Sequence, residues 1–279
     1  MTLDELHEHK LLTASLENVK PLLSLAEDRT RRAFTKGKFR SDEEATLSPE
    51  ESYHLQVFNY STTLLSTIDK AGTCQLLLRR FPEGYYDRAS GITPFTWMSY
   101  HYGYYIVILN SIVDIALVLT NVALTLGFEE KKCKWHTIVK DSRVRRLKLN
   151  DVLEKLDKVI TVRRELRNVH VHRGEDINLA KVLDDDLVNA YHLIDFTTRI
   201  SQKANNGTDT LDPEKQALLE YGHRTTSSDL NVSIQTELDS IINVTGELFN
   251  SLYRYYNAAT KIFAAAKLAE RFQQSDQDK

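Results

Sequence analysis

Glycine and proline are scarce in this 279-residue chain, and that scarcity constrains its fold more than any other feature. The sequence holds 10 glycines and 5 prolines, together about 5% of the residues where an average chain has about 12%. All-β folds and disordered linkers need many more turn-forming residues than this. We therefore expect a helical protein, and its length allows one large domain or two modest ones.

The overall charge gives no general attraction to nucleic acid or to anionic lipid. The formal net charge is −3, and hydrophobic residues make up 42% of the chain, so binding to a polyanion would have to come from a local basic patch. The two cysteines, Cys74 and Cys133, are too few for a disulfide scaffold or a cysteine-based zinc site. The polar, acidic N-terminus lacks the pattern of a signal peptide. These features predict a cytoplasmic protein.

One apolar segment, residues 104–128, raises the question of a membrane. Its longest unbroken apolar runs are five or six residues, whereas a span needs about 20, so we expect a buried helix and no membrane association. Asn110, Asp114, Asn121 and Thr125 fall on one face of that helix. They are either a polar stripe that is solvated or hydrogen-bonded in the core, or a set of side chains that supports a site elsewhere.

Helix boundaries can be predicted from capping residues and from glycine and proline. Ser48-Pro49-Glu50-Glu51 has a serine cap, proline in the first helical position and acidic residues in the first turn, and Thr93-Pro94 begins another helix in the same way. Gly37, Gly127 and Gly174 are predicted to follow helix ends. The segment 129–148 is predicted as a basic linker. The expected helices cover about residues 2–36 (as one or two helices), 49–80, 94–126, 150–172, 183–203, 213–221 and 228–273.

These helices predict the domain organisation. No proline occurs between Pro94 and Pro213, and this stretch together with the long terminal helix forms a natural four-helix unit with antiparallel packing. We predict a four-helix domain over residues 91–279, preceded by an N-terminal helical extension over residues 1–90. No repeat and no strand pattern is visible.

The expected helix over residues 150–172 changes character toward its end. Its apolar face continues, by steps of three and four, onto Arg163 and Arg167. Burial of an unpaired charge costs several kcal/mol, so either the helix frays at a cationic end or these arginines face a partner or an anion. The apolar face before them consists of Leu149, Val152, Leu153, Leu156, Val159 and Ile160.

The order Arg167-Asn168-x-x-x-His172 resembles the R-x4-6-H motif of the HEPN superfamily. The resemblance implies an all-α, HEPN-like four-helix bundle, and many members of that superfamily are metal-independent endoribonucleases in toxin, antiphage and RNA-processing systems. It implies His172 as the general acid or base, Arg167 as the group that stabilises the phosphate, and Asn168 as the residue that orients substrate or histidine. Candidate supporting residues are His170, Arg163, Arg164 and Asp114.

These residue types suit RNA cleavage without a metal. Histidine titrates near neutrality and can move the proton of a ribose 2′-hydroxyl, and a guanidinium can hold phosphate oxygens. On an ideal helix Arg167 and His172 lie about 140° apart, whereas Asn168 and His172 are an i, i+4 pair. His170 lies closer to the Arg167 side and is the competing candidate. A bend in the helix, a helix end near Gly174, or a second subunit that supplies one of the two residues would allow arginine and histidine to meet.

The resemblance also implies partners. HEPN nucleases typically pair two motifs across a dimer interface, so a single motif in this chain implies a homodimer. The expected substrate is RNA, with single-stranded RNA as the first candidate. A toxin would have an antitoxin or nucleotidyltransferase partner. The modifiable tyrosine that follows the histidine in some HEPN toxins is replaced here by Arg173-Gly174-Glu175, which argues against that form of control.

No cofactor and no metal are expected. A metal site built from His170, His172, Glu175 and Asp176 is disfavoured because histidines at i, i+2 point to different sides of a helix. The three acidic residues at 184–186 are better explained as the charged start of a helix.

The most basic part of the chain is the candidate RNA-binding tract. Charge runs are usually solvated loops, but cations with an interleaved aromatic residue also suit an RNA backbone and a stacked base. The candidate RNA-binding residues are Lys131, Lys132, Lys134, Trp135, Lys140, Arg143, Arg145 and Arg146.

The sequence thus predicts a HEPN-type endoribonuclease. The alternative is a non-catalytic HEPN-like module that binds RNA, a nucleotide or a protein, and a third reading is a purely structural helical scaffold.

Overall fold

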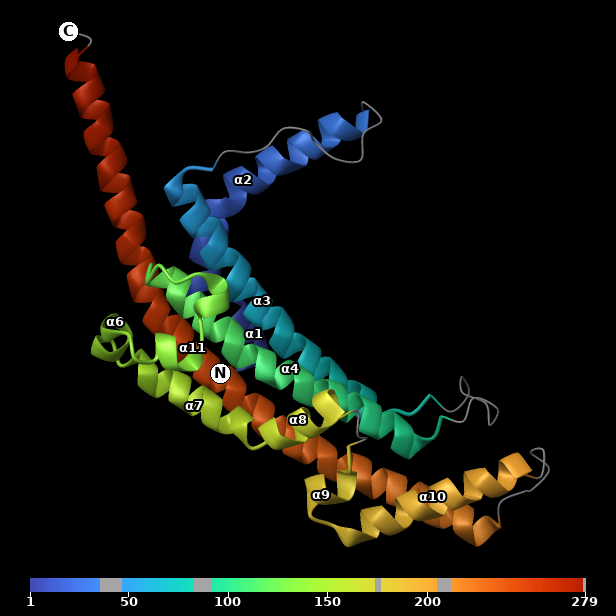
Figure 1. Cartoon of the computed structure of the whole chain (residues 1–279). Helices are drawn as coiled ribbons and strands as arrows, with labels where there is room; N and C mark the ends of the chain where they lie inside the picture. Colours follow the sequence, from blue (N-terminus) through green and yellow to red (C-terminus); the bar gives the residue numbers. More distant parts are fainter. Residues whose placement is uncertain (36–46, 83–91, 174–176, 205–211, 278–279) are drawn as a thin grey trace. The chain divides into compact units, whose positions relative to one another are not determined.

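The computed structural model describes residues 1–35, 47–82, 92–173, 177–204 and 212–277, and every regular element within these ranges is a helix (Figure 1). The prediction of an all-α chain is confirmed. The elements are α1 (Leu3–His7), α2 (Lys10–Thr35), α3 (Pro49–Leu78), α4 (Pro94–Ala123), the 3-10 turn η2 (Glu130–Lys132), α5 (Trp135–Ile138), α6 (Ser142–Arg146), α7 (Leu149–Thr161), α8 (Arg164–Arg173), α9 (Leu179–Leu183), α10 (Asp186–Ala204) and α11 (Pro213–Gln277).

The chain divides into two compact units. Unit 1 consists of Met1–Ser66, Ile112–Asp157 and Ile242–Lys279, and unit 2 consists of Thr67–Ser111 and Lys158–Ile241. Helices α3, α4, α7 and α11 each contribute a segment to both units. This spatial division differs from the division along the sequence into residues 1–90 and 91–279, which stays a prediction.

The predicted helix starts at two prolines are confirmed. At Ser48 the hydroxyl accepts from the Glu51 N–H at 3.2 Å, and the Glu51 carboxylate accepts from the Ser48 N–H at 2.8 Å. This reciprocal pair satisfies two donors that the first turn of α3 would otherwise leave without partners. Thr93 caps α4 in a similar way, because its hydroxyl accepts from the Thr96 N–H at 3.3 Å.

Two predicted boundaries are wrong. The helix expected over residues 150–172 is broken into α7 and α8 by a turn at Val162 and Arg163. The break expected after Tyr221 does not exist, because α11 continues without interruption through Gly222. The predicted linker also contains short helices, since η2, α5 and α6 lie within residues 129–148.

Glycines do not only mark helix ends in this fold. Gly127 does follow the end of α4, with a φ of +84° that suits glycine, whereas Gly37 and Gly174 lie outside the described residues. Gly222 lies inside α11, and a Cβ on it would come 2.4 Å from Cγ of the Tyr191 ring. The absence of a side chain at Gly222 therefore lets α10 pack closely against α11.

Gly222→Ala is expected to destabilise the protein by about 1–2 kcal/mol, because the clash with a buried ring exceeds the gain in helix propensity. The matched control is Gly72→Ala in α3, where a Cβ would meet nothing within 4 Å; this change should stabilise by up to about 1 kcal/mol. Urea unfolding followed by circular dichroism measures both. Equal stabilisation by the two variants would contradict the close approach of Tyr191 to α11.

Unit 1 is organised around Tyr256 of α11. Its hydroxyl accepts a hydrogen bond from the side-chain nitrogen of Asn18 in α2 at 2.8 Å and is hydrogen-bonded to Nδ1 of His54 in α3 at 2.7 Å. Its ring stacks on Tyr53 with the ring centroids 5.8 Å apart. One buried hydroxyl thus ties three helices together. Burial lowers the pKa of His54.

Unit 2 is built where α3, α4, α8, α10 and α11 meet. Gln75 of α3 donates to the backbone carbonyl of Asn231 in α11 at 3.2 Å, and the Ser227 hydroxyl of α11 donates to the Leu78 carbonyl at 2.7 Å. From α4, Phe95 stacks on Tyr191 of α10 with centroids 6.5 Å apart. These contacts hold the helices around the segment that carries the candidate motif.

Helix α4 contains the apolar segment considered above. Among the described residues it is the helix that is long and apolar enough, by length and composition, to cross a membrane, and two thirds of its most apolar stretch is buried within the protein. This agrees with the expectation of a core helix.

Candidate functional site

The motif helix α8 is anchored at its start by a buried ion pair. The Arg163 side chain, 12% exposed, lies in the turn before α8, and its Nε donates to Oε1 of Glu237 in α11 at 2.9 Å. A terminal nitrogen of Arg163 donates to the Ser233 hydroxyl at 3.0 Å. Arg163 can continue the apolar face of α7 because Glu237 supplies the counter-charge inside the fold.

Tyrosines from α4 complete this cluster. The Tyr105 hydroxyl donates to the other carboxylate oxygen of Glu237 at 2.9 Å, and the Arg163 guanidinium lies 6.0 Å from the centroid of the Tyr102 ring. Burial, reinforced by the charge of Glu237, raises the pKa of Tyr105 far above its usual range, so this hydroxyl remains a donor. Glu237 therefore fixes the start of α8 to both α4 and α11.

The three motif residues lie on the continuous part of α8. Asn168 and His172 are exposed and share one face as an i, i+4 pair, whereas Arg167 is half-buried. A terminal nitrogen of Arg167 donates to Oδ1 of Asn168 at 3.2 Å. Although the Cα positions of Arg167 and His172 lie about 140° apart around the axis, this bond draws the guanidinium toward the face that carries His172.

Part of the Arg167 side chain is buried without a partner. Its Nε is inaccessible to solvent and has no hydrogen-bond acceptor among the described residues. The stem of Arg167 is therefore enclosed by unit 2, and the terminal nitrogens are the part that a ligand can reach.

His170, the competing histidine, packs against the backbone of α4. It is half-buried, and a Cβ on Gly103 would come 2.6 Å from its Nε2 and 3.0 Å from its Cε1. The glycine in α4 thus provides the space that the imidazole occupies. His170 is placed as a contact between α8 and α4, while His172 is placed at the surface. Arg164, the first residue of α8, is also exposed.

The basic tract lies in unit 1, and most of its cations are exposed. Lys131 and Lys132 both approach Glu129, at 3.4 Å each. Trp135 opens α5 and is half-buried. The exposed cations of the tract that form no ion pair with a described residue are Lys134, Lys140, Arg145 and Arg146.

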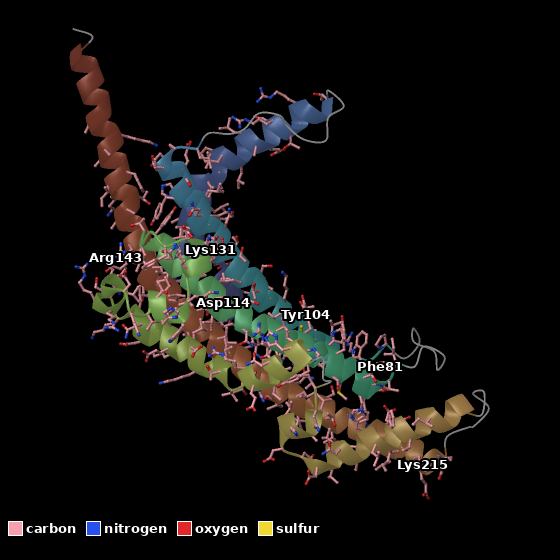
Figure 2. The ribbon with its side chains drawn as sticks, viewed as in Figure 1. Phe81, Tyr104, Asp114, Lys131, Arg143 and Lys215 are labelled. Carbon is pink, nitrogen blue, oxygen red and sulfur yellow. The ribbon has the colours of Figure 1, made fainter. Side chains whose placement is uncertain are left out.

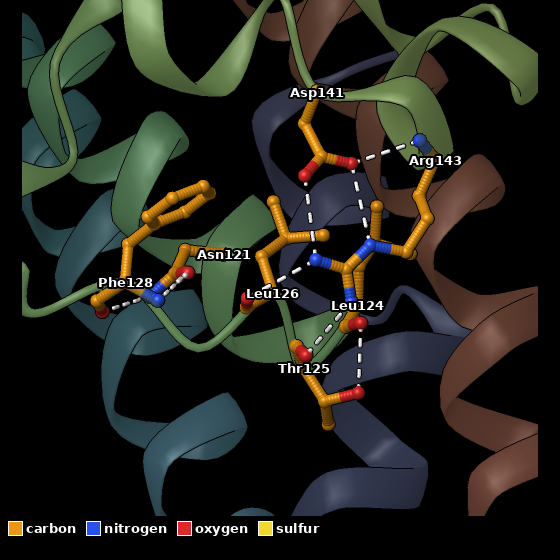
Figure 3. A network of polar contacts seen from close by, with 7 residues as sticks. All are labelled: Asn121, Leu124, Thr125, Leu126, Phe128, Asp141 and Arg143. Carbon is orange, nitrogen blue, oxygen red and sulfur yellow. Dashed lines mark hydrogen bonds and ion pairs between the residues drawn. The ribbon is translucent and has the colours of Figure 1, made fainter.

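Arg143 has a structural position within this tract (Figure 3). Its terminal nitrogens donate to the carbonyls of Thr125 and Leu126, at 3.1 Å each, and its Nε lies 3.3 Å from Oδ1 of Asp141. The side-chain hydrogen bond from Arg143 holds the pKa of Asp141 below its usual range. Arg143 therefore binds the backbone that leaves α4, where Asn121 holds Phe128 by two further bonds.

Asp114 lies beside the basic tract in unit 1 and not in unit 2 with α8. With Lys131 and Lys134 it lines an open pocket of about 610 Å³. Figure 2 labels Asp114 and Lys131. Of the other polar residues predicted on its stripe, Asn110 donates to the Ile106 carbonyl within its own helix at 2.9 Å. Nothing in the described contacts connects this stripe to α8.

Comparison with known families gives a match to residues 84–257, over half of the chain, with the family described as HEPN_Cthe2314-like HEPN. The chain belongs to this HEPN family. The matched region contains the whole of α4, α7, α8 and α10 and the first part of α11. A comparison with curated proteins and with solved structures finds no match.

Membership confirms the HEPN resemblance and the all-α HEPN fold class. It points to a nuclease or another RNA-related function. Within the described residues, no group of three His, Cys, Asp or Glu side chains is placed to hold a metal ion; Glu175 and Asp176, weighed above as metal ligands, lie outside them.

Two residues that hold the candidate site in place were missed in the sequence analysis. Glu237 is 74 positions from Arg163, and no local pattern marks it as the partner. Gly103 lies in an apolar helix. The rarity of glycine in this chain was the only sequence feature that could have marked it as a packing position.

Proposed function

We propose that this HEPN protein is a metal-independent endoribonuclease with Arg167, Asn168 and His172 at its centre. The observation that carries the proposal is the bond from Arg167 to Asn168, which brings the guanidinium toward the face of the exposed His172. Family membership supports an RNA-related function for the segment that contains these residues.

The proposed reaction uses the ribose 2′-hydroxyl as the nucleophile. Neutral His172 accepts the hydroxyl proton, the 2′-oxygen bonds to the adjacent phosphorus, and the bond from phosphorus to the 5′-oxygen breaks. The leaving oxygen takes a proton from a second acid, which gives a 2′,3′-cyclic phosphate and a 5′-hydroxyl. Arg167 stabilises the charge that develops on the phosphoryl oxygens, and Asn168 holds Arg167 in place.

This reaction supports the proposal of a homodimer. A base and an acid act in the same step, and one imidazole cannot do both at once. Each chain carries a single motif, so His172 of a second copy is the natural source of the acid.

The exposed cations of the basic tract are proposed to bind the RNA backbone, with Trp135 as a stacking residue. Arg143 contributes less to RNA binding in this proposal, because its donors are already used by Asp141 and by two backbone carbonyls. We also propose a cytoplasmic location, which the two free, buried cysteines suit, and a role as a toxin or defence nuclease controlled by an antitoxin or nucleotidyltransferase partner.

The test is incubation of the pure protein with mixed RNA in excess EDTA, followed by analysis of the product ends. We expect cleavage that survives EDTA and leaves 2′,3′-cyclic phosphates. Arg167→Ala should slow it about 10²- to 10³-fold, whereas Lys181→Ala, which removes an exposed cation of α9, should leave it unchanged. Salt-sensitive binding of RNA that stays intact would instead identify a non-catalytic HEPN module.

A further inference from the structure

A second pocket lies in unit 2, where the end of α3 meets α11. It has a volume of about 540 Å³, and none of its nine lining residues is acidic. Arg79 comes from the chain just after α3, and the other lining residues come from α11. Arg224, Ser228, Asn231 and Gln235 recur at steps of four, three and four, so they form one face of α11.

The position of Arg79 is fixed by a buried amide. Its Nε donates to Oδ1 of Asn231 at 2.9 Å, and Asn231 is 8% exposed. The Asn231 side-chain nitrogen donates in turn to the Ser227 carbonyl at 2.7 Å. Burial of an amide is favourable only when its groups are bonded, and here one of the two bonds orients a guanidinium at the rim of a pocket.

The remaining donors of the two arginines are available. Within the described residues, Nε is the only side-chain nitrogen of Arg79 that forms a hydrogen bond, and Arg224 is exposed. Neither arginine forms an ion pair with a described residue. Guanidinium groups that line one pocket with no carboxylate repel one another unless an anion lies between them. His223 adds an imidazole to the same lining.

We propose that this pocket binds the phosphate group of a small phosphorylated molecule. A guanidinium matches phosphate oxygens with paired N–H groups, and a preset side chain loses less entropy on binding. The Ser228 hydroxyl and the exposed side chain of Val232 offer contacts to the rest of the ligand.

The lining favours a small ligand over an RNA strand. Its cations gather at one pocket and do not form a strip, and it contains no aromatic side chain other than His223 on which bases could stack. The volume lies within the range of about 300–1,000 Å³ that is usual for small-molecule sites. This site is independent of the proposed RNA cleavage, since it uses no residue of α8.

The test is calorimetric titration of the full-length protein with pyrophosphate. We expect saturable binding, one pyrophosphate per chain. Arg79→Gln and Arg224→Gln should each weaken it at least about tenfold, because each removes a charge-assisted contact. The matched control is Arg80→Gln, which removes a neighbouring exposed cation that does not line the pocket and should change the affinity less than about twofold.

Three outcomes would overturn the proposal. They are the absence of saturable pyrophosphate binding, equal affinities of the wild type and Arg224→Gln for pyrophosphate, and displacement of pyrophosphate by an RNA decamer that has no terminal phosphate. Arg224 is exposed, so Arg224→Gln keeps the test decisive if Arg79→Gln does not fold, which thermal unfolding will show. Arg167→Ala should bind pyrophosphate like the wild type, which separates failure of this site from failure of the proposed nuclease.

Discussion

The His172→Ala variant is expected to cleave RNA at least about 100-fold more slowly than the wild type and to keep its fold. A positioned acid or base contributes about 10²- to 10⁴-fold to a rate, and His172 is exposed, so its removal leaves no cavity. Single-turnover cleavage of a labelled RNA in EDTA measures the rate, and circular dichroism verifies the fold.

The matched comparison is His170→Ala, two positions earlier on α8. Its ring packs on α4 at Gly103, so we expect a lower melting temperature and a rate per folded molecule that stays within about tenfold of wild type. The assignment of His172 is wrong if His172→Ala cleaves like the wild type while folded His170→Ala is inactive.

Glu237→Ala is expected to lower the free energy of unfolding by about 3–5 kcal/mol. The change leaves Arg163 enclosed without its counter-charge, and breaking a buried pair on one side is far more costly than removing the pair as a whole. It also removes the acceptor of the Tyr105 hydroxyl. Urea unfolding provides the free energy, and the midpoint should fall accordingly.

The same helix supplies a control for this variant. Glu247 of α11 pairs with Lys155 at 2.7 Å, but both side chains are about half exposed. Glu247→Ala should therefore cost less than about 1 kcal/mol. If Glu237→Ala proves no more costly than Glu247→Ala, the ion pair does not anchor α8. Arg163→Met combined with Glu237→Leu should recover much of the lost stability, because no buried charge is then left alone.

Local features of the fold could be predicted from the sequence because their causes are local. Ser48 and Thr93 cap helices with groups three residues away, and such short-range bonds can be recognised in any chain. The helical class followed in the same way from the few glycines and prolines. The motif on α8 was recognised through its resemblance to the HEPN superfamily, and family membership supports that prediction.

What could not be predicted depends on contacts between distant segments. The helix predicted from residue 213 was ended at residue 221, yet the next residue, Gly222, is a packing position inside α11, because the deciding contact is with Tyr191, 31 residues earlier. The break before α8 was missed since Arg163 turns toward a carboxylate on α11. Arg143 was predicted to bind RNA from its charge alone, and only the fold shows that backbone carbonyls occupy its donors. Whether the predicted site residues act on RNA stays a prediction.

Because α8 is held by the contact between Arg163 and Glu237, the order in which the chain is synthesised determines when α8 can become stable. A ribosome that has just completed α8 has not yet made Glu237, which follows Arg163 by 74 residues. A helix of 10 residues is marginal in water without tertiary support. The motif therefore takes its shape only after the part of α11 that carries Glu237 has emerged. For a nuclease of the proposed kind, the nascent chain would hold no formed site until translation has passed Glu237.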